Sequence, residues 1–268
     1  MNRIIKAVER ARHERHLATP RQRQLVPAEI TYTQTRTVPH YPGWLRQHRI
    51  ITHDSKATHI DAYKVLRTRV SQRMRQNHWT TLAITSPGPN EGKTLTAINL
   101  SISLAMEPDL TVLLVDADFR RPSIHTYLGL EVELGLTNHL LENTPFEQIL
   151  IHPAIRHMVI APAGAPVTES SELLASPRMQ QLVRELKTRY ASRLIIFDLP
   201  PLLSSDDTLA FAPYVDAVLL VIEEGKTTQD EFASTIALLQ SANQNLIGTV
   251  LNKAAETNLH YGYYPIAS

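Results

Sequence analysis

The stretch Thr85–Thr94, which reads TSPGPNEGKT, has the residue types of a loop that binds phosphate groups. When a glycine-containing loop leads into a helix, its backbone N–H groups and the positive helix N-terminus together attract anions. Lys93 is then predicted to reach the β- and γ-phosphates of a nucleotide, and the Thr94 hydroxyl to bind Mg²⁺. The generic pattern has a glycine where Pro87 stands, but Gly92-Lys93-Thr94 opens a predicted helix after a predicted strand. The sequence therefore predicts a nucleotide site here.

Three aspartates at the ends of apolar runs could hold a metal ion and accept a proton. Asp116 and Asp118 end one run and share one face of an extended strand, and Asp198 ends another run. Open α/β sheets bind ligands at this carboxyl edge of their strands. Because neighbouring carboxylates repel each other, we expect a cation between or near them. The predicted Mg²⁺ ligands are Thr94, Asp116 and Asp198, and a spare carboxylate can serve as a general base.

Apolar runs that alternate with amphipathic segments predict the elements that must position these residues. The runs predicted to be strands are Thr80–Ser86, Leu110–Val115, His157–Ala161, Leu194–Phe197, Ala217–Ile222 and Leu246–Leu251. Helical periodicity marks three segments, which are Ile60–Met74, Thr94–Met106 and Pro177–Arg189, the last with Ser176 as its N-cap. Near-continuous apolar strands between helices predict an α/β fold with a mostly parallel sheet covered by helices on both faces.

The composition allows a large core and excludes cysteine chemistry. Of the 268 residues 43% are hydrophobic and none is cysteine, so there is neither a disulfide framework nor a thiolate metal site. No apolar run approaches the roughly 20 residues that span a bilayer. The start, MNRIIKAVERARHERHL, is too charged for a signal peptide. We therefore expect a soluble, intracellular protein.

The net charge of +1 hides a basic first part of the chain. Residues 1–80 hold 16 Lys and Arg against 5 Asp and Glu (16 − 5 = +11), and the remainder holds 11 against 21 (11 − 21 = −10). A helix is predicted over residues 2–17, and the prolines of residues 18–50 predict an extended linker with one short strand at Ile30–Thr37. The basic arm indicates an anionic partner or docking on the chain's own acidic domain.

Taken in order, the motifs resemble those of one family. The segments SPGPNEGKT, VLLVDADFRRP, IIFDLPP and VLNK, followed by a tyrosine-bearing tail, are similar to the bacterial tyrosine autokinases of capsule and exopolysaccharide assembly over about residues 57–264. The segments YTQTRTVP and SSDDTLAFAPYVDA further resemble the branch found with exosortase-linked exopolysaccharide loci. The resemblance implies a P-loop NTPase fold related to the MinD/ParA ATPases, with ATP and Mg²⁺ as cofactors.

The resemblance also implies roles for individual residues. Three motifs correspond to those of the family, which are Walker A at Gly92, Lys93 and Thr94, Walker A′ at Asp116 and Asp118, and Walker B at Asp198. Asp118 is implied to help take the proton from an incoming tyrosine hydroxyl. The predicted catalytic residues are therefore Lys93, Asp116, Asp118 and Asp198, and Arg120 or Arg121 could help to stabilise the transferring phosphoryl group.

The chain ends in HYGYYPIAS, with three tyrosines within four residues. Gly262 and Pro265 argue against a regular element, and chain termini are usually mobile. A terminal strand that buries these rings on the domain is the alternative. We expect Tyr261, Tyr263 and Tyr264 to be the phosphoacceptors, modified within one subunit or between neighbouring subunits. The chain is thus divided into a basic arm and linker (1–56), a P-loop kinase domain (57–258) and a tyrosine-bearing tail (259–268).

Differences from related motifs indicate which nucleotide the site binds and to which branch of related ATPases the chain does not belong. MinD/ParA ATPases have a signature lysine where Gly88 stands, so the partitioning branch is disfavoured. Guanine-binding loops need a carboxylate where Ala255 follows Asn252-Lys253, so ATP is favoured over GTP. The residues predicted to contact the nucleotide are Gly88, Asn90, Glu91, Gly92, Lys93, Thr94, Leu95 and Asn252.

Assembly and partners follow from the resemblance. The family carries Glu-x-x-Arg-x-x-Arg at its ring contact, where this chain has Asp61, Lys64 and Arg67. The charges match, although aspartate is shorter than glutamate and lysine lacks the bidentate fork of arginine. The resemblance implies a homo-oligomer, a ring in the family, held at the inner face of the membrane by a membrane-anchored polysaccharide copolymerase, without nucleic acid.

Three functions fit these motifs. The first is an ATP-dependent protein tyrosine autokinase that regulates exopolysaccharide polymerisation or export, and the aspartate pair with the tail tyrosines favours it. The second is a P-loop ATPase whose nucleotide state switches assembly without kinase activity. The third is a nucleotide-sensing subunit that regulates a membrane polysaccharide machine without catalysing a reaction.

Overall fold

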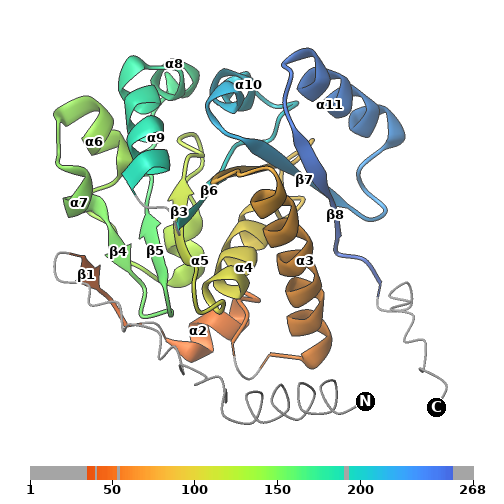
Figure 1. The fold of residues 1–268 in the computed structure, drawn as a ribbon, viewed down its shortest axis with the longest axis horizontal. Helices are drawn as coiled ribbons and strands as arrows, with labels where there is room; N and C mark the ends of the chain where they lie inside the picture. Colours follow the sequence, from red (N-terminus) through yellow and green to blue (C-terminus); the bar gives the residue numbers. More distant parts are fainter. Residues whose placement is uncertain (1–34, 40, 53–54, 190–192, 256–268) are drawn as a thin grey trace, which may run out of the picture. The chain divides into compact units, whose positions relative to one another are not determined.

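The computed structural model describes residues 35–39, 41–52, 55–189 and 193–255, and its centre is an eight-stranded sheet (Figure 1). The strand order is β1-β4-β5-β3-β6-β2-β7-β8. Neighbours are parallel except β4 and β5, which pair antiparallel at Ile151 and Ile160. The strands are β1 (Arg36–Thr37), β2 (Thr81–Thr85), β3 (Thr111–Asp116), β4 (Ile151–His152), β5 (Met158–Ala161), β6 (Arg193–Asp198), β7 (Ala217–Glu223) and β8 (Leu246–Asn252). The predicted mostly parallel sheet is confirmed.

Helices cover both faces of the sheet (Figure 1). One face carries α2 (Pro42–Gln47), α3 (Ala57–Gln76), α4 (Lys93–Ala105) and α5 (Ile124–Leu128). The other carries α6 (Leu136–Glu142), α7 (Phe146–Ile149), α8 (Ser170–Leu174), α9 (Pro177–Arg189), α10 (Asp207–Phe211) and α11 (Gln229–Ser241). A short 3₁₀ helix, η1 (Ala212–Tyr214), precedes β7. A hydrophobic core lies on each face of the sheet, the first under α2–α5 and the second under α6–α11. Because successive side chains of a strand point to opposite faces, Leu82 and Ile84 of β2 belong to the first core and Ala83 to the second.

The predicted elements agree with the observed ones in type and order. All six predicted strands are present, as β2, β3, β5, β6, β7 and β8. Helix α9 begins as expected, since Ser176 Oγ accepts a hydrogen bond of 3.2 Å from Met179 N. Its apolar stripe, which includes Met179 and Leu186, is buried.

The segment before α3 differs from the predicted extended linker. Within its described part, β1 pairs with β4, and only Arg36–Thr37 of the predicted strand at Ile30–Thr37 is observed. Helix α2 follows, because Pro42 stands at a first-turn position where a missing N–H is no disadvantage. Leu45 and Ile50 are only 2% and 1% exposed. Both side chains therefore belong to the core of the domain, although that domain was predicted to begin at residue 57.

Two further predictions concern residues that the structure does not describe. The helix over residues 2–17 and the tail over residues 259–268 both lie outside the described residues. In the part of the chain that is described, no helix has both the length and the apolar character needed to cross a membrane.

Asp216 connects three elements at the amino-terminal edge of the sheet. Its Oδ2 accepts hydrogen bonds of 2.9, 2.9 and 2.8 Å from Thr80 N, Thr81 N and Thr81 Oγ1, and its Oδ1 accepts one of 2.7 Å from Lys187 of α9. Burial alone would raise the pKa of Asp216, but the bonds from Lys187 and the threonines outweigh it and lower the pKa. The carboxylate thus joins the start of β2 to β7 and α9.

We expect Asp216→Asn to lower the free energy of unfolding by about 1–3 kcal/mol at pH 7, since several hydrogen bonds to a charged group are weakened. The folded-state pKa lies below the ordinary value, so this stability is present above the ordinary pKa and is lost as the pH falls through the folded pKa. The deficit should therefore shrink between pH 5 and about pH 3. Denaturant unfolding at pH 7, 5 and 3 measures it.

Asp61→Asn is the matched control, because the pair that Asp61 forms with Lys64 is 65% and 55% exposed. Such a surface pair contributes little to stability. An Asp216→Asn protein that is as stable as the wild type at pH 7, or equally destabilised at pH 3, would contradict the assigned role.

Candidate active site

The loop between β2 and α4 has a backbone that only glycine fits at its last position. Gly92 precedes α4 with φ +95°, in the left-handed region. A Cβ there would lie 2.0 Å from Asn252 Nδ2. The Asn252 amide donates a 2.8 Å hydrogen bond to the Glu91 carbonyl, so the end of β8 contacts the loop directly. Because the first N–H groups of a helix have no acceptor within it, this geometry leaves them available to an anion.

Glu91 stabilises the loop from within. Its side chain is buried, and its Oε2 accepts a 2.8 Å hydrogen bond from Gly88 N. Its Oε1 accepts a hydrogen bond from Thr227 Oγ1 in the turn after β7. Glu91 and Asn252 were predicted to contact the nucleotide, and in the structure both contact the loop itself. The three-residue spacing between Gly88 and Glu91 allows this hydrogen bond within the loop. The same spacing also allows Glu91 to contact a nucleotide, so the sequence alone does not distinguish the two roles.

Two lysines hold the carbonyl side of the same loop. Lys226 Nζ donates to Pro89 O at 2.7 Å, and Lys253 Nζ donates to Asn90 O at 2.8 Å. Lys253 also pairs with Glu223 Oε2 at 2.9 Å. With these carbonyls engaged on the outside, the loop is fixed from the turn after β7 and from the end of β8.

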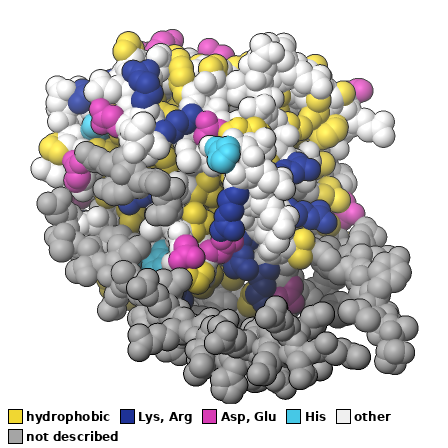
Figure 2. All heavy atoms as spheres, in the orientation of Figure 1, with side chains coloured by type: hydrophobic (Ala, Val, Ile, Leu, Met, Phe, Trp, Pro, Cys, Tyr) yellow, Lys and Arg dark blue, Asp and Glu magenta, His cyan; other side chains and the backbone are white. Residues whose placement is uncertain are grey.

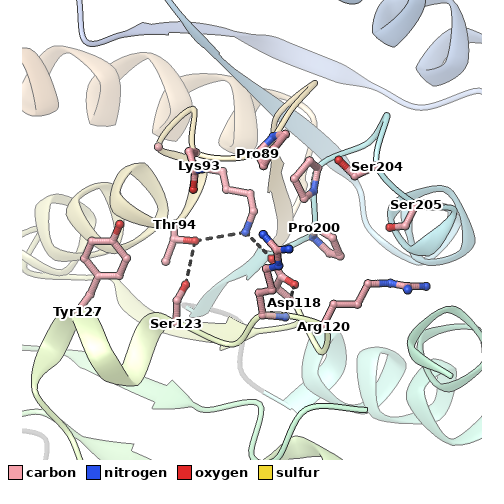
Figure 3. Close-up of a pocket in the computed structure, with 14 residues that line it drawn as sticks. Pro89, Lys93, Thr94, Asp118, Arg120, Ser123, Tyr127, Pro200, Ser204 and Ser205 are labelled. Carbon is pink, nitrogen blue, oxygen red and sulfur yellow. Dashed lines mark hydrogen bonds and ion pairs between the residues drawn. The ribbon is translucent and has the colours of Figure 1, made fainter. Parts of the chain in front are cut away.

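The Lys93 side chain points toward Asp118 (Figure 3) and also lies close to Asp198. Its Nζ is 2.8 Å from Asp118 Oδ2 and 3.4 Å from Asp198 Oδ1. Thr94 Oγ1 donates a 2.6 Å hydrogen bond to Asp198 Oδ2, and Ser123 Oγ lies 3.4 Å from Thr94 Oγ1. The first two residues of α4 are thereby joined to the ends of β3 and β6, as the motifs predicted.

Asp116 is fully buried and holds the chain that follows β3. Its Oδ2 accepts hydrogen bonds of 3.0 Å from both Ser123 N and Ile124 N, and its Oδ1 accepts one of 3.3 Å from Asp118 N. Burial and the neighbouring Asp198 carboxylate raise the pKa of Asp116 to about 7. Its oxygens are thus engaged by backbone N–H groups, and its side chain does not line the cavity described below.

Lys93 and Asp198 also shift each other's pKa. Burial would lower the pKa of Lys93, but the carboxylates of Asp198 and Asp118 outweigh it and raise that pKa. Burial raises the pKa of Asp198 although Lys93 and Thr94 oppose the shift. A desolvated cluster of three acids and one ammonium is short of positive charge, which favours a cation in or beside it.

A cavity of about 410 Å³ opens beside this cluster. Five predicted residues line it, namely Asn90, Gly92, Lys93, Thr94 and Asp118, together with Arg120 and Arg121. Six other residues of the predicted site do not line the cavity. They are Gly88, Glu91, Leu95, Asp116, Asp198 and Asn252. The Leu95 side chain packs against the first core, so a ligand would meet that residue only through its backbone.

Sequence reasoning missed half of the cavity wall. The missed residues are Pro89, Ser123, Tyr127, Pro200, Pro201, Ser204 and Ser205. Pro200 and Pro201 could have been found, because they follow Asp198 directly. Ser123 and Tyr127 belong to the start of α5 and its last turn, and a five-residue helix gives no periodic signal.

The two arginines after Asp118 are held differently. Arg120 Nε and Nη2 donate to the two oxygens of the buried Asp207 at 2.8 and 2.9 Å. Arg121 donates through its backbone N to Asp118 Oδ1 at 3.0 Å, which leaves its side chain at the cavity. Both guanidinium groups add positive charge to a cavity suited to phosphate.

The donor set fits Mg²⁺ and a nucleotide. Among the described residues no group of three or more His, Cys, Asp or Glu side chains could hold a metal ion by itself. Mg²⁺ in phosphoryl-transfer sites takes only one or two protein oxygens and completes its shell with phosphates and water. The Thr94 hydroxyl and the Asp198 carboxylate, 2.6 Å apart, are hard oxygen donors of the kind that such an ion takes. Asp116, the third predicted ligand, instead accepts hydrogen bonds from backbone N–H groups.

Sequence comparisons agree with this geometry. The family model of the AAA domain AAA_31 matches residues 82–248. The tyrosine-protein kinase YwqD of Bacillus subtilis is 32% identical over 212 residues, which are 79% of this chain and 88% of YwqD. The putative tyrosine-protein kinase EpsB of Ralstonia solanacearum is 32% identical over 76% of this chain, and the match spans only 27% of EpsB.

Structural comparisons point the same way. The kinase domain of the Escherichia coli tyrosine kinase ETK superposes with a TM-score of 0.70 at 28% identity, covering 85% of this chain and 94% of that domain. The septum site-determining protein MinD of Pyrococcus horikoshii, solved with Mg-ADP, gives a TM-score of 0.54 at 23% identity over 64% of this chain and 69% of MinD. The MinD likeness shows the fold, and the predicted MinD/ParA-like P-loop architecture is confirmed.

We expect Lys93→Ala to weaken Mg-ATP binding about 10- to 100-fold, because it removes a charge-assisted contact to phosphate and leaves Asp118 and Asp198 without their ammonium partner. Calorimetric titration of the folded variant measures the affinity. Lys64→Ala is the matched control, since Lys64 pairs with Asp61 on the exposed face of α3. Unchanged affinity in the Lys93 variant would show that the nucleotide binds elsewhere.

Proposed function

The chain belongs to the bacterial tyrosine-protein kinases, and on that premise we propose that it is an autokinase that transfers the γ-phosphoryl group of ATP to tyrosines of its own tail or of a neighbouring copy. In this reaction the tyrosine oxygen bonds to the γ-phosphorus, the bond to the ADP oxygen breaks, and the phenol proton passes to a carboxylate. The products are ADP and phosphotyrosine.

The observation that supports this proposal is that the three aspartates make different contacts. Asp116 is engaged by backbone N–H groups, and Asp198 by Thr94. Asp118 is the one whose side chain lines the cavity, where Lys93 and Arg121 N orient its two oxygens. A carboxylate oriented in this way at a phosphate site can accept the proton of an incoming hydroxyl. This arrangement supports Asp118 as the general base.

The other site residues bind and position the phosphates. The loop N–H groups and Lys93 neutralise charge on the β- and γ-phosphates. Mg²⁺, held through Thr94 and Asp198, would supply further neutralisation. Of the two arginines, Arg121 is the better candidate to contact the transferring phosphoryl group, because Arg120 already donates two hydrogen bonds to Asp207.

We further propose that the protein works in a homo-oligomer beside a membrane-anchored polysaccharide copolymerase, where it regulates exopolysaccharide assembly. Figure 2 shows Lys and Arg side chains gathered around α3 on the face turned to the viewer. Asp61 and Lys64 on α3 are exposed, which suits a contact between subunits. Arg67 instead donates to Ser103 O at 3.1 Å, so it contributes within the chain.

Incubation with Mg-ATP is expected to place phosphate on Tyr261, Tyr263 or Tyr264, which lie outside the described residues. Changing all three to Phe should remove most of the phosphotyrosine that mass spectrometry detects. Asp118→Asn is the test of the site, because it should keep ATP binding and lower the rate about 10²- to 10⁴-fold.

Phosphate found only at other positions would contradict the tail as acceptor. ATP hydrolysis without any phosphotyrosine would favour an ATPase switch. Nucleotide binding with neither reaction would favour a sensing subunit, and both outcomes would overturn the kinase proposal.

Deleting residues 1–34 is expected to release the protein from membranes and to leave Mg-ATP affinity unchanged. Each basic residue near an anionic surface contributes on the order of 1 kcal/mol, and the arm is rich in Lys and Arg. The deletion stops at residue 34 because Leu45 and Ile50 belong to the core. Co-sedimentation of both proteins with membranes measures the effect. Equal co-sedimentation would show that the arm is not the anchor.

A further inference from the structure

Tyr127 is the one aromatic side chain among the described residues that line the cavity (Figure 3). It lies four residues after Ser123, and residues with this spacing are neighbours on one face of a helix. Ser123 Oγ is 3.4 Å from the Thr94 hydroxyl. The Tyr127 ring is therefore about one helical turn from the predicted phosphate and Mg²⁺ site, and none of the steps described above uses it.

Two rings, one from α2 and one from the residue that follows it, pack next to Tyr127. The His48 ring meets it edge-on, with centroids 6.1 Å apart at 77°. His48 stacks on Trp44 with centroids 4.4 Å apart at 23°. The His48 Nδ1–H donates a 3.0 Å hydrogen bond to Trp44 O, which fixes the orientation of the imidazole. The three rings form a continuous series from α2 to the cavity wall.

Trp44 is itself fixed to α5. Its Nε1 donates a 3.1 Å hydrogen bond to Thr126 O. Gly129, with φ +66°, lies so close that a Cβ would stand 2.9 Å from Trp44 Cδ1. The next residue, Leu45, is buried in the same core as Ile124 of α5. The position of Trp44 thus depends on the start, the end and the buried face of α5.

The same segment is tied to α4. Ile51 N donates to Asn99 Oδ1 at 2.9 Å, and Asn99 Nδ2 donates to Arg49 O at 3.1 Å. Asn99 is buried in α4, the helix that begins with Lys93 and Thr94. We call residues 41–51 the N-terminal brace, because they connect the helix that carries Thr94 to the helix that carries Tyr127.

We propose that Tyr127 is a specificity-determining residue of the acceptor site, whose ring receives the ring of the incoming tyrosine, and that the N-terminal brace is its positioning element. This inference rests on the proposed kinase function. Aromatic pairs favour offset-stacked or edge-to-face contacts with centroids about 4.5–7 Å apart. A serine or threonine acceptor has no ring to make this contact, so the same residue selects the acceptor type and places its oxygen near Asp118.

Steady-state kinetics with a random copolymer of glutamate and tyrosine as acceptor test the role of Tyr127. The enzyme is the full chain with Tyr261, Tyr263 and Tyr264 changed to Phe, so that the tail does not compete. Tyr127→Leu should raise the KM for the copolymer about five- to tenfold, the range expected for one aromatic pair, with the KM for ATP unchanged. Tyr127→Phe keeps the ring and should restore the KM to within about twofold of the background enzyme.

A double-mutant cycle tests the brace. Trp44→Ala should raise the KM for the copolymer about threefold when Tyr127 is present, and should add nothing in the Tyr127→Leu protein. Trp44→Phe retains stacking and should behave like the background enzyme. Trp79→Phe, between α3 and β2 and outside the lining of the active-site cavity, is the control for loss of an indole. Thermal midpoints within a few degrees of each other show that the variants are folded.

Three outcomes would overturn the inference. An unchanged copolymer KM in Tyr127→Leu removes Tyr127 from the acceptor site. A raised KM for ATP in that variant places the ring against the nucleotide instead. Additive effects of Trp44→Ala and Tyr127→Leu overturn the role of the brace. If the chain with its tail tyrosines intact binds Mg-ATP but forms no phosphotyrosine, the proposed function itself has failed, and this inference fails with it.

Discussion

The burial of charge at the carboxyl edge of the sheet is the constraint on which the surrounding structure depends. The side chains of Lys93, Asp118 and Asp198 are only 11%, 5% and 0% exposed. Buried ions of this kind are strongly destabilising unless partners satisfy them. The register that sets Asp116 opposite Asp198 on β3 and β6 brings the acids together, and the start of α4 must supply the ammonium and a hydroxyl. Small displacements of α4 or β6 would therefore leave an uncompensated charge.

Hydrogen bonds from neighbouring side chains likewise hold the phosphate-binding loop in its conformation. Its carbonyl groups are engaged on the outside by Lys226 and Lys253 and, at Glu91, by the amide of Asn252. Gly88 N donates to Glu91 Oε2, and the N–H groups nearer the start of α4 can act together as a concave anion site. Both ammonium groups also pair with Glu223 Oε2, at 3.5 and 2.9 Å, so the three groups together add one net positive charge beside the loop.

The sequence predicted the fold well where periodicity is long and poorly where it is short. The six predicted strands were recognisable because each is a nearly continuous apolar run, and the motif acids were predicted to meet because they follow strands at the carboxyl edge of a parallel sheet. The engagement of Asp116 by backbone N–H groups was not predictable, since it depends on how the chain folds back to place Ser123 N and Ile124 N. Helix α2 was missed because the prolines of residues 18–50 suggested a linker and Leu45 is its single buried residue. The wall residue Tyr127 was missed because α5 has five residues.

The contact between β8 and the loop also limits how far from the site the tail can reach. Ala255, the last described residue, has its N–H bonded to Glu224 Oε2 at 2.6 Å, two residues after the lysine that holds Asn90 O. An extended chain spans at most about 3.6 Å per residue, so Tyr261 cannot be farther than roughly 22 Å from that anchor. A short flexible segment holds its end at a local concentration in the millimolar range. If the tail tyrosines are the acceptors, as proposed above, a segment of this length would favour phosphorylation within one complex over phosphorylation of free copies in solution.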